Sequence, residues 1–416
     1  MTESFPRLLV ATEFSPNASG GGPAVVRQML RNWPTEKLFW WSCSSDHEAQ
    51  FGRAFNVQRV AVIPRRLYPH RRCRALKSWL MQHFWTPWAT RHLRNTIEEL
   101  RPEVVWVIPH CWAIPPLGQV LQNFGIGFHV SMHDYADNQG CIFRFGRRRS
   151  QKMSAIADQL YASATTRDAI SDSMRTDLHS RTGRDGTVLH AGLEPNDFEY
   201  LENKGERTLG EIRIAYAGTI IVEKTFATFV DALNRVRNRI STPVSLEFFT
   251  GHSYRTREWF DPSWMRERGL MAEPALSEAL KKFAWGFAPM SLSDDDPRYN
   301  RFSLPTKFVS YLAAGLPVIT LGHPESSLVK MAQTYRVGPC LSSGEPETMQ
   351  EELFSALSNR NPWAQFGSEI QRCGHAEFDA ERMRKTLYEC FATCSRRLRS
   401  RDRMRFSDQR ASEVAI

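Results

Sequence analysis

Lys307 lies near the start of a short helix that the sequence predicts within LPTKFVSYLAAGLPVITL, residues Leu304–Leu321. Ser303 can cap this helix, Pro305 is tolerated in its first turn, and Gly315 is a suitable C-cap. A cation in the first turn opposes the helix dipole unless an anion lies beside it. Free N–H groups at a helix start, together with one lysine, form a natural phosphate site. The alternative is a solvated lysine with no ligand.

Two other loops follow apolar, strand-like segments and carry residues suited to ligand binding. Gly20, Gly21 and Gly22 come after the first such segment, and glycine lets backbone N–H groups approach a ligand closely. Their spacing fits neither a dinucleotide fingerprint nor a P-loop. His133 adjoins a carboxylate, so it can position a hydroxyl or move a proton near neutral pH, or it can be a structural histidine. His110 is a weaker candidate of the same kind.

Strand-like and helix-like segments alternate along the chain, which predicts parallel sheets covered by helices on both faces. The expected strands are Arg7–Thr12, Lys37–Ser42, Gln58–Ile63, Glu103–Ile108, Ile126–Met132, Ile212–Ala217, Val244–Phe249, Trp285–Pro289 and a strand from Val318. A chain of 416 residues is too long for one ordinary core, so two domains are expected. The expected divisions are residues 1–195, a polar linker 196–211, a second domain 212–375, a closing helix 376–395 and a basic tail 396–416.

The overall charge favours anionic partners. The chain carries 54 lysines and arginines against 45 acidic residues, a formal charge of +9. Its eight cysteines have no CxxC pair and no zinc-type spacing, which is typical of a reducing compartment. Neither a secretion signal nor an apolar run of membrane-spanning length is evident, so a cytoplasmic location is expected. Zinc-finger, homeodomain-like and RNP-type motifs are missing, so nucleic acid is not expected as a partner.

A basic stretch from Ala49 to Ile97 contains no Asp or Glu. It includes Arg71, Arg72 and Arg74 together with Trp79, and several apolar residues follow at helical spacing. A basic amphipathic segment with tryptophan can lie on an anionic membrane surface or hold an anionic acceptor. The alternative is an ordinary helix that buries its apolar face and exposes its basic one. The tail adds six arginines between residues 396 and 405, and it can hold lipid phosphates or remain solvated.

The segment around Lys307 resembles the donor site of GT-B glycosyltransferases, most closely the large group around family 4. The resemblance rests on Pro305-Thr306-Lys307, then Tyr311-Leu312-Ala313-Ala314-Gly315, then Pro317-Val318-Ile319. It implies two Rossmann-like, doubly wound α/β domains that face a cleft, with the C-terminal helix returning to the N-terminal domain. Such enzymes use sugars activated by nucleotide diphosphates.

The same resemblance implies a set of site residues. In the family an arginine follows a glycine after a strand, and a lysine comes five positions later; here Thr219 replaces the arginine and Lys224 matches the lysine. His133 would lie near the reacting sugar, and Lys224 and Lys307 would hold the diphosphate. The implied donor-binding residues are Gly20, Gly21, Gly22, Gly218, Thr219, Gly251, Ser303 and Thr306.

Two departures from the family pattern affect what can be carried over. Many relatives have two glutamates eight positions apart, and Phe302 and Ser310 stand at those positions here. Sugar and ribose recognition by carboxylates is therefore not implied. The run Asp294-Asp295-Asp296 can in principle hold Mg²⁺ through oxygen ligands, but a solvated acidic loop is the preferred interpretation. No metal and no cofactor are expected.

The resulting hypothesis is a glycosyltransferase that moves a sugar from a nucleotide-diphosphate sugar to a glycan or lipid-linked acceptor. Polysaccharide or lipopolysaccharide biosynthesis is the expected setting, with the anomeric configuration retained and the protein cytoplasmic or peripheral at the inner face of a membrane. Two rivals remain. One is a sugar-nucleotide epimerase, which needs carboxylate acid/base residues. The other is a non-catalytic GT-B subunit that binds a partner or a membrane.

Overall fold

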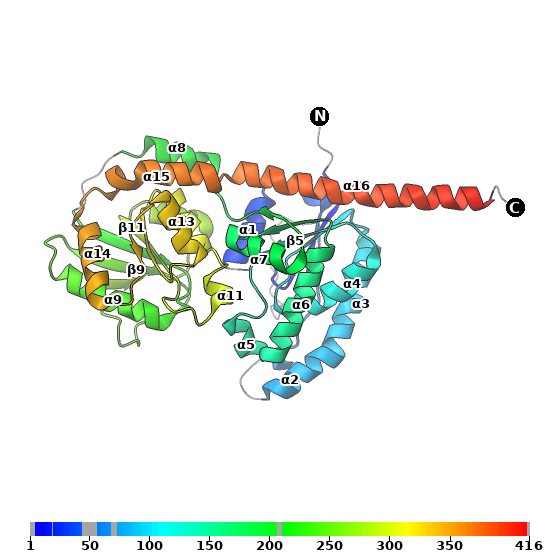
Figure 1. The fold of residues 1–416 in the computed structure, drawn as a ribbon, viewed down its shortest axis with the longest axis horizontal. Helices are drawn as coiled ribbons and strands as arrows, with labels where there is room; N and C mark the ends of the chain where they lie inside the picture. The colour runs from blue at the N-terminus through cyan, green and yellow to red at the C-terminus, as the bar shows by residue number, and fades with distance from the viewer. Residues whose placement is uncertain (1–4, 19, 44–55, 68–72, 206–209, 414–416) are drawn as a thin grey trace. The chain divides into compact units, whose positions relative to one another are not determined.

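The computed structural model describes residues 5–18, 20–43, 56–67, 73–205 and 210–413 (Figure 1). The chain divides into two compact units. Unit 1 comprises residues 1–189 and 384–416, and unit 2 comprises residues 190–383. The chain therefore enters unit 2 once and returns to unit 1 through its C-terminal helix.

Unit 1 is built on a seven-stranded parallel sheet in the order β3-β2-β1-β4-β5-β6-β7. Leu8 on β1 pairs with Leu38 on β2 and with Val104 on β4. The central strands are buried along their whole length, as expected where helices cover both faces of a parallel sheet. The strands are β1 (Leu8–Thr12), β2 (Leu38–Ser42), β3 (Val57–Val60), β4 (Val104–Val107), β5 (Phe128–Met132), β6 (Thr166–Ala169) and β7 (Thr187–Val188).

The helices of unit 1 cover this sheet. They are α1 (Gly21–Met29), α2 (Arg74–Leu80), α3 (Thr86–Leu100), α4 (Ile114–Phe124), α5 (Gln139–Phe145), α6 (Arg147–Ser163) and α7 (Asp172–Thr182). Helix α4 packs between α3 and α6. The last helix, α16 (Ala380–Glu413), packs on unit 1, where Tyr388 donates a hydrogen bond to the Met29 carbonyl (3.0 Å) and the Phe391 ring contacts Trp106. The expected return of the C-terminal helix is thus confirmed.

Unit 2 is built on a six-stranded parallel sheet in the order β10-β9-β8-β11-β12-β13. Its strands are β8 (Ile212–Ala217), β9 (Val244–Phe249), β10 (Met265–Glu267), β11 (Trp285–Pro289), β12 (Val318–Leu321) and β13 (Cys340–Leu341). The sequence analysis did not anticipate the two edge strands β10 and β13. They span three and two residues, too short for a recognisable apolar pattern.

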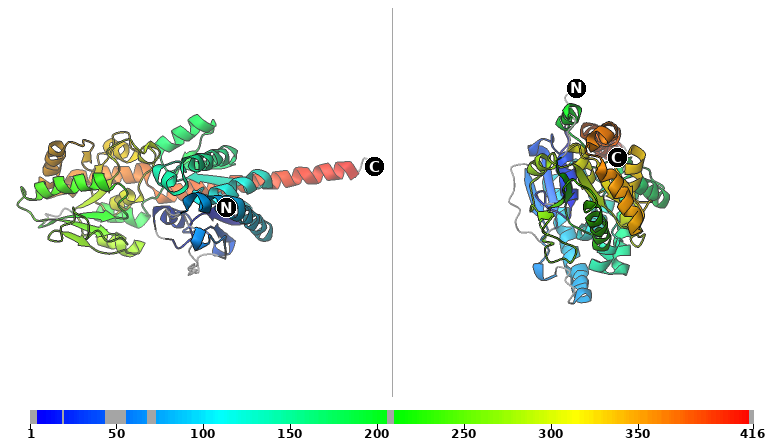
Figure 2. Two further views of the ribbon diagram at one scale, coloured as in Figure 1. Left: turned by 90° about the horizontal axis from the view of Figure 1, so that it is seen from below. Right: turned by 90° about the vertical axis from the view of Figure 1, so that its left-hand side faces the viewer.

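Helices lie on both faces of the second sheet (Figures 1 and 2). They are α8 (Pro195–Asn203), α9 (Glu223–Arg237), α10 (Glu273–Leu280), α11 (Pro297–Asn300), α12 (Thr306–Ala313), α13 (Ser327–Tyr335), α14 (Pro346–Ser358) and α15 (Pro362–Glu377). One buried cluster lies under α9 and α14, and the other joins α8, α10, α12, α13 and α15. The prediction of two doubly wound α/β domains is therefore confirmed.

Residues 195–203 differ from the predicted polar linker because they form helix α8 of unit 2. The sequence contains the local signals for this helix. Pro195 occupies its first turn, and the Glu194 and Asp197 side chains form a reciprocal capping box. Leu201 is buried in the core of unit 2 and fixes the helix there. The division between the units falls before this helix, at residues 189 and 190.

Candidate functional site

The loop after β8 brings the first group of predicted residues together in unit 2. Gly218 is exposed, has φ of 104°, and donates its N–H to the carbonyl of Phe249 at the end of β9 (2.9 Å). The positive φ explains the glycine at this position. Thr219 is exposed, and its carbonyl accepts a hydrogen bond from the Tyr216 hydroxyl (2.7 Å). Gly251 is also exposed, just past β9, so the two loops border the same edge of the sheet.

Lys307 lies beside this loop. Its ammonium donates a hydrogen bond to the Tyr216 hydroxyl (3.1 Å) and lies 4.2 Å from the centroid of the same ring. A Cβ atom added at Gly218 would lie 3.6 Å from Lys307 Nζ. The lysine from α12 and the glycine after β8 are therefore neighbours, although 89 residues separate them in the sequence.

The Lys307 ammonium is shielded but makes no ion pair with any residue that the structure describes. Lys307 as a whole is partly exposed, yet its charged end lies against the Tyr216 ring, and this burial lowers the pKa of Lys307 to about 7. Desolvation disfavours a charged amine when no counter-ion compensates. An anion bound next to Lys307 would supply that compensation, so the side chain is poised to bind one.

Tyr311 holds α12 against the sheet and so fixes the position of Lys307. Its hydroxyl accepts a hydrogen bond from the N–H of Ala217 (2.8 Å) and donates one to the carbonyl of Phe287 (3.2 Å). The ring packs over Gly286, where an added Cβ would come within 2.3 Å of it. Tyr311 thereby fixes the helix to the end of β8 and the middle of β11.

The C-terminal end of α12 closes as its sequence suggests. Gly315 has φ of 64°, and its N–H and that of Leu316 bond back to the carbonyls of Leu312 and Tyr311 (2.9 Å each). The Lys204 ammonium donates to the carbonyls of Ala314 and Gly315 at 3.2 and 2.6 Å. A cation at a helix C-terminus is favourable, because it interacts with the negative end of the helix dipole. Lys204 therefore stabilises the turn that ends α12.

Ser303 does not cap α12, which corrects the expected helix start. The helix begins at Thr306 with Pro305 as the N-cap residue, and no side chain caps it. Ser303 is buried, and its N–H bonds to the Tyr299 carbonyl. Because Pro305 disfavours helical geometry in the residue before it, Leu304 does not form the first helical residue after a Ser303 cap. The N–H groups of Thr306 and Lys307 therefore have no acceptor within the helix.

Lys224 occupies the first turn of α9, which starts after the Gly218 loop. Its side chain is exposed and forms no ion pair or hydrogen bond with the described part of the chain. It is therefore free to meet a ligand, but the described contacts do not bring it to Lys307 as they bring Gly218. Its participation in the same anion site stays a prediction.

The acidic run Asp294-Asp295-Asp296 follows β11, and its first residue forms an ion pair with Arg301. Asp294 accepts a hydrogen bond from Arg301 Nε (3.0 Å), and this ion pair lowers the pKa of Asp294. Asp296 is the N-cap residue of the short helix α11. Within the described ranges, the run does not form a group of three side chains that could share a metal ion.

In unit 1 the glycine loop and His133 come together at the ends of β1 and β5. Gly20 has φ of 117° and precedes α1, which starts at Gly21. Arg27 holds the loop through hydrogen bonds to the carbonyls of Pro16 and Ala18 (2.9 Å each). A Cβ atom at Gly22 would lie 3.8 Å from His133 Nδ1. The structure thus joins two predicted features from separate strands.

The His133 imidazole is available to a ligand. It makes no hydrogen bond with the residues that the structure describes. Burial lowers the pKa of His133, and this effect outweighs the nearby carboxylates Asp168 and Asp134. A neutral imidazole can donate one hydrogen bond and accept another. It is therefore suited to orient a hydroxyl group.

An additional polar pair lies at the same edge of the unit 1 sheet. Glu13, just after β1, lies 2.8 Å from His110 Nδ1, which follows β4. Burial disfavours the imidazolium, but the hydrogen bond and charge of Glu13 outweigh it and raise the pKa of His110 to about 9. The sequence analysis named His110 only as a weaker candidate and did not identify Glu13. Because Glu13 and His110 are 97 residues apart in the sequence, no local sequence pattern indicates that they form a pair.

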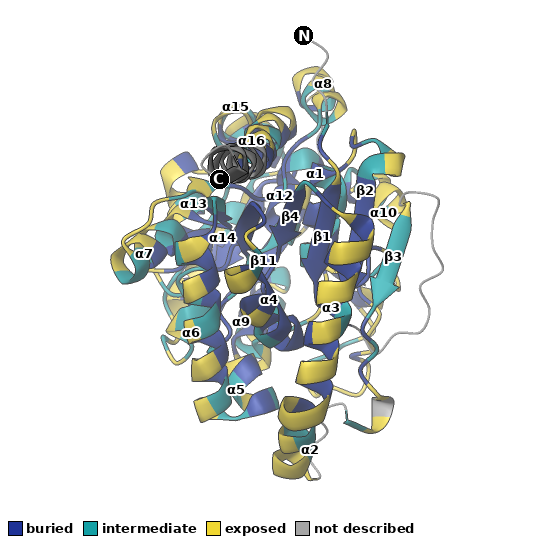
Figure 3. Cartoon of the chain, turned by 90° about the vertical axis from the view of Figure 1, so that its right-hand side faces the viewer, coloured by how far each residue is buried: buried dark blue, intermediate teal, exposed yellow. Residues whose placement is uncertain are grey.

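The basic segment has an exposed apolar surface. Arg74 begins α2 and donates to the Phe143 carbonyl of α5 (2.9 Å), and Trp79 is 48% exposed. The residues around α2 are mostly exposed (Figure 3), so this helix does not simply bury its apolar face. The other large exposed apolar residues of this surface are Leu76, Phe84, Trp88 and Phe143. Arg71 and Arg72 lie outside the described residues, and no described helix has the length and apolar character to span a membrane.

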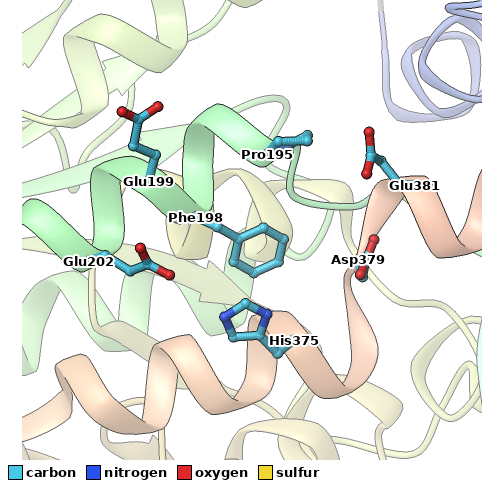
Figure 4. Close-up of a pocket in the computed structure, with 7 residues that line it drawn as sticks. All are labelled: Pro195, Phe198, Glu199, Glu202, His375, Asp379 and Glu381. Carbon is cyan, nitrogen blue, oxygen red and sulfur yellow. The ribbon is translucent and has the colours of Figure 1, made fainter.

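A surface hollow of about 290 Å³ in unit 2 lies at α8, α15 and the start of α16 (Figure 4). The His375 imidazole stacks on the Phe198 ring there, with 4.2 Å between ring centroids. The remaining lining residues are Pro195, Glu199, Glu202, Asp379 and Glu381. Four carboxylates disfavour a pyrophosphate, and none of the predicted site residues lines this hollow. It is not the candidate donor site.

Comparison with known proteins supports the fold. No family profile matches the chain, and no curated protein matches it in sequence. Among solved structures, alpha,alpha-trehalose 6-phosphate synthase from Burkholderia multivorans has a TM-score of 0.64 at 13% identity, covering 96% of this chain and 99% of that chain. Sucrose-phosphate synthase from Thermosynechococcus elongatus has a TM-score of 0.68 at 13% identity, covering 94% and 98%. A TarM variant from S. aureus reaches 0.54 at 10% identity, covering 73% and 59%.

At these identities the likeness establishes the fold alone. The chain has a seven-stranded and a six-stranded parallel α/β unit with its C-terminal helix on the first, and it matches the two synthase structures over nearly their full lengths. The chain therefore has the GT-B fold of two Rossmann-like α/β units.

Proposed function

We propose that this protein transfers a sugar from a nucleotide-diphosphate sugar, which binds to unit 2, to a glycan or lipid-linked acceptor, which binds to unit 1. The observation that carries the proposal is the shielded Lys307 ammonium beside Gly218, which has no carboxylate partner among the described residues. A pyrophosphate is an anion of suitable charge for this position. Binding it would restore the charged form of Lys307.

The chemistry requires departure of a nucleoside diphosphate. Lys307 and the free N–H groups at the start of α12 would stabilise the negative charge that develops on the leaving group. Lys224, Gly218, Thr219 and Gly251 would complete the contacts to the diphosphate. Since ammonium and amide groups supply this stabilisation, the proposed transfer step uses no metal and no cofactor. Retention at the anomeric carbon is the proposed outcome.

On the acceptor side, His133 and the Gly20–Gly22 loop form the proposed binding edge of unit 1. The neutral His133 imidazole would orient a sugar hydroxyl, and the partly exposed backbone of the loop would border the acceptor. The structurally similar S. aureus TarM variant was solved with UDP and alpha-GlcNAc-glycerol, and a Burkholderia xenovorans trehalose-phosphate synthase with glucose-6-phosphate. These ligands support the substrate class without naming the substrate.

We also propose that α2 and its neighbours bring unit 1 to an anionic membrane surface at the cytoplasmic face, where a lipid-linked acceptor for polysaccharide or lipopolysaccharide synthesis would lie. Exposed Trp79 and Phe84 would enter the headgroup region, and Arg74 and Lys77 would meet lipid phosphates. Co-sedimentation with phosphatidylglycerol vesicles tests this. Replacing Trp79 and Phe84 with serine should abolish binding, and binding that persists unchanged would contradict the membrane proposal.

The test of the donor site combines binding and turnover. A panel of nucleotide-diphosphate sugars is screened by thermal shift, because a ligand of the folded state raises its stability. Lys307→Met and Lys224→Met should abolish the shift and the release of nucleoside diphosphate, while Lys330→Met, which removes an exposed lysine paired with Glu325, should leave both unchanged.

The same screen separates the alternatives. A sugar-nucleotide epimerase would convert the nucleotide-sugar to its isomer without releasing nucleoside diphosphate. A non-catalytic GT-B subunit would show no turnover with any donor. Full binding and turnover in both lysine variants would overturn the proposed donor site.

A further inference from the structure

Three side chains of different chemistry meet at the ends of β1 and β4 in unit 1. Glu13 follows β1, and His110 and Cys111 follow β4. One ligand atom from each of the three lies within 4.8 Å of the others. Glu13 is 9% exposed and Cys111 is 2% exposed, whereas the His110 side chain is 37% exposed, so two of the three groups are buried and the imidazole is in contact with solvent. A carboxylate, an imidazole and a thiol form an uncommon combination for a structural core.

The two oxygens of the Glu13 carboxylate are unequally satisfied. Oε2 lies 2.8 Å from His110 Nδ1, whereas Oε1 is buried without an N–H or O–H donor among the described residues; the carboxylate also interacts with the Cys111 thiol, a weak donor. An unpaired buried carboxylate oxygen is costly, and native proteins rarely leave one without a bound water, ion or ligand. Cys111 adds a second local irregularity, because it is a non-glycine residue with φ of 41°. Such strained residues are concentrated at functional sites.

We propose that Glu13, His110 and Cys111 bind a divalent metal ion of the zinc class. Carboxylate, imidazole and thiolate are the three ligand types that proteins use for zinc. With metal–ligand bonds of about 2.0–2.3 Å, tetrahedral ligands lie roughly 3.3–3.7 Å apart, so shifts of about 1 Å suffice to bring the three atoms into place. Calcium and magnesium do not fit, because they require oxygen ligands.

The ligand set matches the charge of a divalent ion. In the bound form the Glu13 carboxylate and a Cys111 thiolate would carry two negative charges, and His110 would bind as a neutral imidazole. These two negative charges balance the two positive charges of the ion. Protons that the ligands release on binding go to solvent.

Neighbouring groups can complete the coordination. The Cys141 thiol of α5 interacts with that of Cys111 and is the candidate for the fourth position. Arg144 Nη1 donates to Cys111 Sγ (3.4 Å), a contact that stabilises a thiolate. The proposal is independent of the donor site in unit 2, since the cluster contains no residue assigned there.

Metal binding is measured directly on the full chain, without nucleotide or acceptor. Protein treated with a chelator and desalted is incubated with Zn²⁺, and the bound metal is determined by mass spectrometry. Co²⁺ is then used as a spectroscopic probe, because a thiolate ligand gives an intense charge-transfer absorption. We expect one equivalent of either metal per chain, with the thiolate band, in the wild type and in the Cys340→Ala control. That control removes a partly buried cysteine of unit 2.

Cys111→Ala should weaken the thiolate band to at most the contribution of Cys141, and His110→Asn should lower the affinity at least tenfold. Glu13→Gln keeps the shape of the side chain and should also weaken binding, with folding of each variant checked by circular dichroism. Wild-type protein that binds no stoichiometric metal would overturn the proposal, and so would a band unchanged in folded Cys111→Ala. Because nucleotide binding by unit 2 is measured separately, failure here leaves the proposed donor site intact, and failure of the donor site does not affect this result.

Discussion

The lowered pKa of Lys307 makes the proposed donor site testable through pH. Burial of the ammonium lowers the pKa of Lys307 to about 7 in the ligand-free protein, compared with an ordinary value of 10.5. A bound pyrophosphate would favour the charged form and raise this pKa again. Above pH 7 the protein must therefore take up a proton in order to bind. Each further pH unit should weaken binding about tenfold, which corresponds to roughly 1.4 kcal/mol.

The best window lies between pH 7.5 and 9, where the terminal phosphate of a nucleoside diphosphate has already lost its last proton. With a pKa of about 7 for Lys307, the proportion of neutral lysine predicts that the dissociation constant rises about 25-fold across this window. A lysine with an ordinary pKa would produce almost no change there. Stability changes in the opposite direction. Because the unfolded chain binds more protons than the folded one between pH 7 and 10.5, this group makes the ligand-free protein more stable as pH rises through that range.

Isothermal titration of UDP and ADP across this window, in buffers matched for ionic strength, measures the effect. Lys307→Arg keeps a charge that does not titrate, so its dissociation constant should be nearly independent of pH. Lys307→Met should bind weakly at every pH, and Lys330→Met, the exposed and paired control, should retain the wild-type slope. The reasoning would be refuted if the wild-type dissociation constant did not change between pH 7.5 and 9 while binding still depended on Lys307. The pKa of Lys307 would then not be lowered by burial.

Three further predictions concern the fold and His133. Gly286→Ala places a Cβ within 2.3 Å of the Tyr311 ring and should lower the free energy of unfolding by about 1–3 kcal/mol in chemical denaturation; unchanged stability would contradict this packing. Asp168→Ala removes the buried acceptor of His129 Nε2 (2.6 Å) and should cost about 3–5 kcal/mol in the same assay, whereas a loss below 1 kcal/mol would show that the pair is not buried as described. Burial lowers the pKa of His133 from 6.5, so the acidic decline of kcat/KM should fall below pH 6.5 and disappear in His133→Asn. A decline that survives in that variant belongs to another group.

The sequence alone was sufficient for the layered α/β architecture and for the position of Lys307. Buried parallel strands are short apolar runs between amphipathic helices, and this pattern is local. The expected strands from Arg7–Thr12 to the one beginning at Val318 all correspond to observed strands. The glycine loop, Gly218 and His133 were found because each lies in the loop after such a strand. In parallel sheets the ligand edge lies at these strand ends.

The tertiary structure decided which partners these residues have. The Tyr216 ring under Lys307 and the Glu13 carboxylate beside His110 come from distant segments, and no spacing in the chain announces either contact. Local rules also gave wrong answers: Ser303 does not cap α12, because the proline that follows shifts the helix start to Thr306, and the predicted linker contains helix α8. Sequence periodicity reports which face of an element is buried. The charge state and availability of a side chain depend on what packs against it, and only the folded chain determines that.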